Sequence, residues 1–121
     1  MKYLTYEEYK QMGGPLEETA FSRFAFGAEQ TIRRATFGRV DKMQEVPEAV
    51  KWLVYELIGI SEQFEKENAN VTSEKVGEWS KSYEVATEAD RQAKTNTLIR
   101  NYLMAETDDN GVPLLYLGVD V

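Results

Sequence analysis

The segment 46–68, VPEAVKWLVYELIGISEQFEKEN, predicts the central helix of this chain. Its apolar residues recur at the spacing of one helix face. The main face consists of Val50, Leu53, Val54, Leu57, Ser61 and Phe64. Pro47 suits the first helical position, and Asn68 and Asn70 suit the end, so we expect a helix over 47–67. Further apolar residues widen the face: Ile58, Trp52, Tyr55 and Ile60. A helix this apolar is usually central in its bundle or is buried by a second subunit.

Two helices are predicted before this segment and one after it. The first spans about 6–12, with Thr5 as its N-cap and two glutamates in its first turn. The second spans 17–36 and stops before Gly38. Its apolar face consists of Phe21, Phe24, Ala25, Ala28, Ile32 and Ala35, while Phe26 lies off that face. The last helix spans about 86–104 and becomes apolar toward its end.

Two segments break the helical pattern. Residues 73–84 read SEKVGEWSKSYE, and neither alternating set in 71–84 forms a clean hydrophobic face. We interpret 71–84 as an extended arm or an imperfect hairpin around Gly77. After a turn signal, the tail 112–121 reads VPLLYLGVDV and could form a strand. This apolar tail either packs back on its own domain or docks on a partner.

These segments together predict a mainly α protein. The 121 residues suit one domain, 1–121, with a modest core. We expect a small bundle of three to four helices with an extended arm and an extended C-terminal tail. No apolar run is long enough to cross a membrane. The opening MKYLTYEEYK lacks the apolar core of a signal peptide, so export is not expected.

The residue types argue against an enzyme. The chain has no cysteine and no histidine, which removes thiolate nucleophiles, disulfides, the commonest general base and the commonest metal ligand. The turn TDDNG (107–111) resembles the start of a calcium loop, but Leu117 stands where a bidentate glutamate belongs. We therefore expect no catalytic residues, no cofactor and no metal site.

The net charge of −7 limits the expected partners. Tight nucleic-acid binding needs several lysines or arginines on one face. The basic residues cluster in one place, at Arg33, Arg34, Arg39 and Lys42, which we interpret as a solvated helix end. DNA passing near such an acidic chain would not bind strongly.

The chain resembles a known family over nearly its whole length. The opening YLTYEEYKQMGGPLEETAFSRFAFGAEQTIRRATFGRV (3–40) contains a YLTYEEY…GG lead-in, an E-T-A-F-x-R helix start and an R-x-T-F-G-R helix end. With the middle SEKVGEWSKSYE, these motifs resemble the small head–tail connector proteins of siphophages and related prophages. Such proteins are also called head-completion or adaptor proteins.

The resemblance implies a structural role in the virion neck. It implies a mostly α-helical subunit, made in the host bacterial cytoplasm, that forms a ring of about twelve copies below the portal. Such a ring extends the DNA channel and docks the next neck, stopper or tail protein. Its partners would be the portal protein, neighbouring copies and passing DNA, which is bound without sequence specificity, and no membrane would be involved.

The same resemblance implies two contact regions. The C-terminal tail of such proteins commonly contacts the portal, and the corresponding residues here are Val112, Leu114, Leu115, Tyr116, Leu117 and Val119. The arm is the second candidate, as a contact with a neighbouring subunit or the channel, through Lys75, Trp79, Lys81 and Tyr83. Alternatively, Trp79 and Tyr83 cover the chain's own bundle.

Other functions remain open from the sequence alone. The acidity also fits a helical binding module, such as a DNA-mimic inhibitor of a nucleic-acid enzyme. That function requires acidic residues on one face, and interspersed lysines count against it: Lys51, Lys66, Lys75, Lys81 and Lys94. A hydrolase that uses only carboxylates is a weaker third interpretation.

Overall fold

The computed structural model describes residues 2–74 and 88–116; for residues 67–74 and 88 it describes the backbone alone. Within this part of the chain the protein is mainly helical, as predicted, and contains no strand. Its elements are α1 (Tyr6–Gln11), α2 (Glu18–Ala35), the short 3-10 helix η1 (Val40–Lys42), α3 (Glu48–Glu74) and α4 (Glu88–Leu103).

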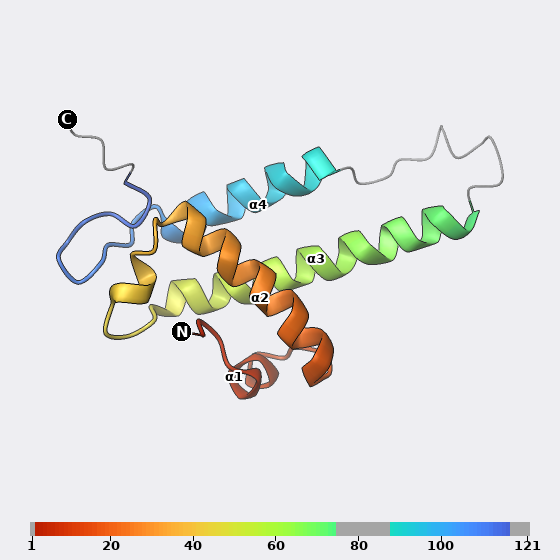
Figure 1. Cartoon of the computed structure of the whole chain (residues 1–121), viewed down its shortest axis with the longest axis horizontal. Helices are drawn as coiled ribbons and strands as arrows, with labels where there is room; N and C mark the ends of the chain where they lie inside the picture. The colour runs from red at the N-terminus through yellow and green to blue at the C-terminus, as the bar shows by residue number, and fades with distance from the viewer. Residues whose placement is uncertain (1, 75–87, 117–121) are drawn as a thin grey trace.

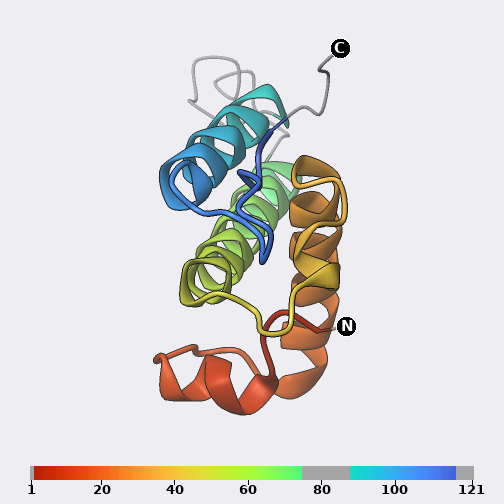
Figure 2. The ribbon, with the colours of Figure 1, turned by 90° about the vertical axis from the view of Figure 1, so that its left-hand side faces the viewer.

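Helix α3 is the central helix and packs against both α2 and α4. Helix α2 crosses it at an angle, α4 runs beside it in the opposite direction, and the last turns of α3 extend past the start of α4 (Figure 1). Seen from the end, α2 and α4 lie against α3, with α1 at the N-terminal end of α2 (Figure 2). The predicted central position of the 46–68 segment is therefore confirmed.

The predicted apolar faces of α2 and α3 form most of the core. The buried residues of these helices are Phe21, Phe24, Ala25, Ala28, Ile32, Val50, Leu53, Val54, Leu57 and Ile58. The predicted margins Ala35, Ser61 and Phe64 are half-buried. Helix α4 adds Ile99 and Leu103. Phe26, which lies off the predicted face, is 63% exposed.

The predicted end of the long helix is wrong. Helix α3 continues to Glu74, whereas the sequence placed its end at 67. Asparagine costs only about 0.7 kcal/mol relative to alanine inside a helix, so Asn68 and Asn70 do not stop one that contains good helix formers. Residues 71–74 of the predicted arm are therefore helical, and residues 75–84 lie outside the described residues.

The other boundaries are nearly as predicted. Helices α1 and α2 each begin and end within one residue of the expected positions. Helix α4 ends one residue early, and the expected start at 86 falls outside the described residues. Pro47 precedes α3 instead of opening it, because its carbonyl accepts the first helical hydrogen bonds, from Val50 and Lys51.

Three aromatic residues near the N-terminus and one from α3 form an aromatic corner, which consists of Tyr6, Tyr9, Phe21 and Tyr55. The Tyr9 ring centre lies 4.8 Å from that of Phe21 and 5.6 Å from that of Tyr55. Gly14 packs directly on this ring, since a Cβ atom at Gly14 would lie 2.2 Å from it. The Tyr6 hydroxyl donates to the Leu16 carbonyl (3.1 Å), and the Tyr9 hydroxyl accepts from the Leu16 N–H (3.2 Å). The corner is therefore a tightly packed aromatic unit that joins α1 to α2 and α3.

Helix α1 is also fixed by polar contacts. Thr5 Oγ1 accepts from the Glu8 N–H (3.1 Å) and the Glu8 carboxylate accepts from the Thr5 N–H (3.0 Å), so the predicted N-cap is a full capping box. Glu8 also pairs with Lys51 of α3. The Lys51 hydrogen bond holds the pKa of Glu8 below its usual value.

Candidate functional site

One arginine holds the C-terminal segment on the helical core. Arg39 Nη1 donates to the backbone carbonyls of Pro113 (3.2 Å), Leu114 (3.0 Å) and Tyr116 (2.7 Å). We call Arg39 together with residues 113–116 the C-terminal clamp. Hydrogen bonds from a charged donor are about twice as strong as neutral ones, so this one guanidinium fixes the path of the whole segment.

The end of α2 places Arg39 where it can make these bonds. Thr36 is the C-cap, and its hydroxyl donates to the Ile32 carbonyl (2.8 Å). Phe37 and Gly38 then both have positive φ, 57° and 74°. The Gly38 N–H returns to the Arg33 carbonyl (2.9 Å), which completes a Schellman motif. The chain therefore reverses sharply into η1.

Phe37 is an unusual residue for this turn. Glycine normally takes the left-handed position at a helix end, and a side chain there costs about 1–2 kcal/mol. The Phe37 ring is also 51% exposed, so burial does not compensate for the cost. A strained, exposed aromatic residue suggests a use outside the chain's own core.

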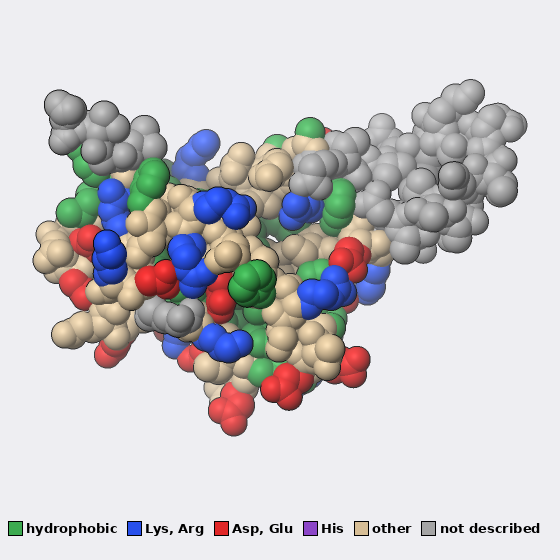
Figure 3. Space-filling view, in the orientation of Figure 1, with side chains coloured by type: hydrophobic (Ala, Val, Ile, Leu, Met, Phe, Trp, Pro, Cys, Tyr) green, Lys and Arg blue, Asp and Glu red, His purple; other side chains and the backbone are tan. Residues whose placement is uncertain are grey.

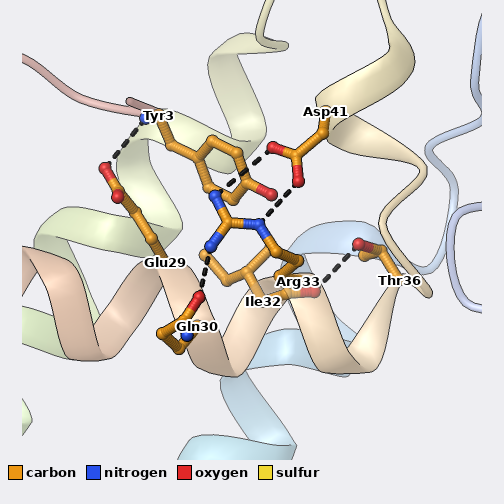
Figure 4. Close-up of polar contacts among 7 residues, drawn as sticks. All are labelled: Tyr3, Glu29, Gln30, Ile32, Arg33, Thr36 and Asp41. Carbon is orange, nitrogen blue, oxygen red and sulfur yellow. Dashed lines mark hydrogen bonds and ion pairs between the residues drawn. The ribbon is translucent and has the colours of Figure 1, made fainter. Parts of the chain in front are cut away.

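A partly buried polar network fixes η1 relative to α2 (Figure 4). Arg33 Nε donates to Asp41 (2.6 Å), and Arg33 also bonds to Gln30. The Tyr3 N–H donates to the buried Glu29 carboxylate (2.9 Å), while the Arg33 guanidinium lies over the Tyr3 ring. The network therefore joins the N-terminal residues, α2 and η1 beside the clamp.

The network shifts the pKa of three of its members. The hydrogen bond to Asp41 raises the pKa of Arg33. The hydrogen bond from Arg33 holds the pKa of Asp41 below its usual value. Burial, reinforced by Asp41, raises the pKa of Tyr3 to about 12. The Tyr3 hydroxyl is buried without a hydrogen bond of good geometry. The network is thus neutral at Tyr3 and ionised at Asp41 and Arg33 near pH 7.

A short turn delivers the C-terminal segment to Arg39. The Asp108 carboxylate accepts from the N–H groups of Asn110 and Val112, both at 2.9 Å. Asp109 accepts from the Gln44 N–H (2.9 Å), which ties the turn to the loop before α3. Leu114 then enters the core and is fully buried. The TDDNG sequence acts here as a turn; within the described residues there is no group of three acidic side chains that could hold a metal ion.

The described part of the tail, residues 112–116, forms a turn, whereas the sequence predicted an extended tail that could form a strand. Residues 112–116 make one isolated bridge, Thr107 with Pro113, followed by a turn in which the Tyr116 N–H donates to the Pro113 carbonyl (3.0 Å). Carbonyls of an extended strand alternate in direction. Three carbonyls that converge on Arg39 are incompatible with that alternation, so the clamp favours the turn.

The predicted tail residues have different positions. Leu114 belongs to the chain's own core, and Leu115 and Val112 are half-buried. Tyr116 is 44% exposed. Leu117 and Val119 lie outside the described residues, as do the arm residues Lys75, Trp79, Lys81 and Tyr83. Contact of these residues with a portal, a neighbour or a channel stays a prediction.

The exposed part of the clamp is aromatic and cationic. The Arg39 guanidinium lies 5.2 Å from the Phe37 ring centre and 5.8 Å from that of Tyr116. Aromatic residues and arginine are enriched at the centres of protein interfaces. The clamp therefore has the composition of a protein-binding surface.

Sequence reasoning missed Arg39 and Phe37 as members of this site. Arg39 was assigned to a solvated basic cluster, and Phe37 received no role. Gly38 signals the helix end in the sequence, but nothing there marks the left-handed conformation of Phe37, because phenylalanine rarely adopts it.

No family model, curated protein or solved structure matches this chain. None of the described helices has the length and apolar composition needed to cross a membrane.

Proposed function

We propose that this chain is a head–tail connector subunit of a tailed phage or prophage. In this proposal, copies form a ring below the portal, extend the DNA channel and dock the next neck, stopper or tail protein. The protein is made in the host cytoplasm and acts in the virion neck. It has no catalytic role.

The observation that carries the proposal is the segment RATFGR, residues 34–39. It is one of the motifs on which the family resemblance rests, and it also builds the clamp. Within it, Thr36 caps α2, Phe37 and Gly38 reverse the chain, and Arg39 binds the C-terminal segment. The resemblance implies that this C-terminal segment contacts the portal. The same motif therefore holds the C-terminal segment in place, and the proposed function requires this segment to be accessible to the portal.

The clamp suits presentation of a partner-binding segment. Leu114 fixes the segment in the core, and Arg39 orients the residues that follow. The Tyr116 and Phe37 rings are then available at the surface, and both lie near the Arg39 guanidinium. We propose that these two rings, with Val112 and Leu115 at the margin, form the described part of the portal contact.

The charge supports a passive role toward DNA. A subunit with a net charge of −7 does not replace counterions on phosphates, so DNA can pass without being retained. The alternative, a DNA-mimic module, requires a continuous acidic face. Lysine and arginine side chains are spread among the acidic ones on the face in Figure 3, which gives that alternative no support there.

Light scattering after size-exclusion chromatography, with and without the cognate portal, tests the proposal. We expect little assembly of the chain alone at moderate concentration and a ring when the portal is present. Tyr116→Ser should weaken portal binding. Met104→Ser is the matched control, because Met104 is a large exposed apolar residue outside the clamp (63% exposed, against 44% for Tyr116).

Electron microscopy of virions provides the decisive observation. The protein should lie at the neck, between the portal and the tail. Its absence from the neck, or its presence only elsewhere in the particle, would contradict the connector function.

A further inference from the structure

Helices α2 and α3 each carry a stripe of exposed and half-buried side chains on the side away from their shared core. The α2 outer face consists of Phe26, Gln30 and Arg34, spaced four residues apart. The α3 outer face consists of Glu48, Trp52 and Glu56, with the same spacing. Residues four apart lie one above the other on a helix, so each stripe is a continuous surface about two turns long.

The α2 outer face is hollowed, and one of its two hollows is basic. Phe26, 63% exposed, stands as a ridge between the hollows. The first is lined by Lys2 and Arg33 but also by Glu29 and Asp41, so its charges balance. The second, between α2, α3 and α4, is lined by Arg34 and Arg91 and, in the described part of the chain, by no acidic side chain. Arg34 forms no ion pair within the described residues. On the face in Figure 3, lysine and arginine side chains lie among acidic ones, so the basic character is confined to the second hollow.

The α3 outer face is acidic and carries a protruding aromatic side chain. Trp52 is 38% exposed and is held edge-on by Tyr55, with ring centres 5.7 Å apart. Glu48 and Glu56 lie one turn on either side of it, and neither has an ion-pair partner within the described residues. Tryptophan is the residue most enriched among those that dominate binding energy at interfaces.

We infer that the two faces bind each other between copies of this chain. Trp52 of one copy would enter the second hollow, beside Phe26 of the next, with Glu48 and Glu56 facing Arg34. Complementary charge favours a second copy as the occupant, because the chain carries −7 overall and like faces repel, whereas these unlike faces attract.

The contact is heterologous, since each copy uses a different surface. Because the stripes lie opposite the buried sides of their helices, they point in different directions, and every copy retains one unused face. Heterologous contacts form rings when the rotation closes and open chains when it does not. The closed form of this assembly rests on the proposed connector function, whereas the pairing of the two faces does not.

A mixing experiment tests the pairing. Phe26→Ser removes the α2 ridge but retains Trp52, and Trp52→Ser does the reverse. Each variant alone should lose concentration-dependent self-association in analytical ultracentrifugation, with affinity lowered about tenfold or more. An equimolar mixture should form a dimer and stop there, because each variant has one intact face. Met104→Ser, as exposed as Phe26 and outside both faces, should behave as the unmodified chain.

The outcomes separate this inference from the proposed function. The unmodified chain should associate at high concentration and low ionic strength, and salt should weaken the association because the charges are exposed. The inference is overturned if the unmodified chain stays monomeric under those conditions, or if the mixture stays monomeric. It is also overturned if the variants assemble on the portal as the unmodified chain does. If the variants still assemble on the portal, the connector function stands and the pairing is wrong. If the protein is absent from the virion neck, the connector function is wrong and the pairing is unaffected.

Discussion

The aromatic corner and the C-terminal clamp both attach a short segment to the α2–α3 core, but different forces hold them. The corner depends mainly on packing: Tyr9 packs among three other rings and against Gly14, and the Tyr6 and Tyr9 hydroxyls add hydrogen bonds, both to the Leu16 backbone. The clamp depends on one buried leucine and on hydrogen bonds from Arg39 to three carbonyls. The corner therefore belongs to the cooperative core, whereas the clamp can open locally without unfolding the rest.

The largest effect is expected in the corner. Tyr9→Ala removes a fully packed ring and leaves a cavity, so it should lower the free energy of unfolding by about 4 kcal/mol. Urea denaturation followed by circular dichroism measures the change. A loss below about 1 kcal/mol would show that the Tyr9 ring is not tightly packed in the folded protein.

A double-mutant cycle sharpens this test. Gly14→Ala alone should be destabilising, because the new methyl group meets the Tyr9 ring at 2.2 Å. In the Tyr9→Ala background the same methyl group enters vacated space. The two changes should therefore be strongly non-additive, with the double variant more stable than the sum of the single effects. Additive effects would show that Gly14 is not constrained by the ring.

The next largest effect is expected at the clamp's anchor. Leu114→Ala should cost about 3 kcal/mol, since Leu114 is fully buried. Because the segment can detach, Leu114→Asp should cost little more than Leu114→Ala. In the cooperative corner, by contrast, a charged substitution of Tyr9 should be much worse than alanine. Urea titrations of the alanine and the charged variants at Leu114 and at Tyr9 measure these losses of stability. If the charged variant exceeded the alanine variant by the same ratio at both positions, the two regions would not differ in cooperativity.

Arg39→Ala should have a smaller and more local effect. We expect about 1 kcal/mol, because the bonds are charged but partly exposed. Hydrogen exchange should accelerate at the Leu114 and Tyr116 amides, which bond to the Glu106 and Pro113 carbonyls. The Tyr9 amide, in α1, should exchange as before. Faster exchange throughout α1 would indicate that the clamp is not an independent unit.

Tyr3→Phe should have almost no effect at neutral pH. The Tyr3 hydroxyl is buried without a good hydrogen bond, so its removal leaves no partner unsatisfied. At alkaline pH the outcome differs. The folded-state pKa is about 12, above the ordinary value of 10.0, so Tyr3 contributes stability that is complete below pH 10 and is lost as the pH rises through 12. The variant should therefore resist alkaline unfolding over this interval, as pH titration of its stability would show. A neutral-pH loss above about 1 kcal/mol would reveal a real hydrogen bond to Asp41.

The sequence predicted what depends on helical periodicity. The buried faces of α2 and α3 contain the expected residues, and the Thr5 cap was recognised because a threonine precedes a first turn with two glutamates. These features are local, so spacing alone reveals them. The end of α3 was missed because Asn68 and Asn70 only weakly oppose a helix.

The clamp could not be predicted in the same way. Arg39 and Tyr116 are 77 residues apart, and no local pattern indicates that a guanidinium will meet three carbonyls. Tyr3 and Leu4 were likewise missed as core residues, because a two-residue apolar stretch before a helix has no period. The structure brings these residues together through tertiary packing, which a single sequence does not encode in its spacing.

The length of chain between Arg39 and Tyr116 also has a kinetic consequence. Contacts between distant residues close late in folding, because the entropy of loop closure opposes them until the core exists. Changes at Leu114 or Arg39 should therefore accelerate unfolding and leave the folding rate nearly unchanged, which stopped-flow measurements over a range of denaturant would detect. A partner that holds residues 113–116 would act on the same step. Docking would then lengthen the lifetime of each folded subunit.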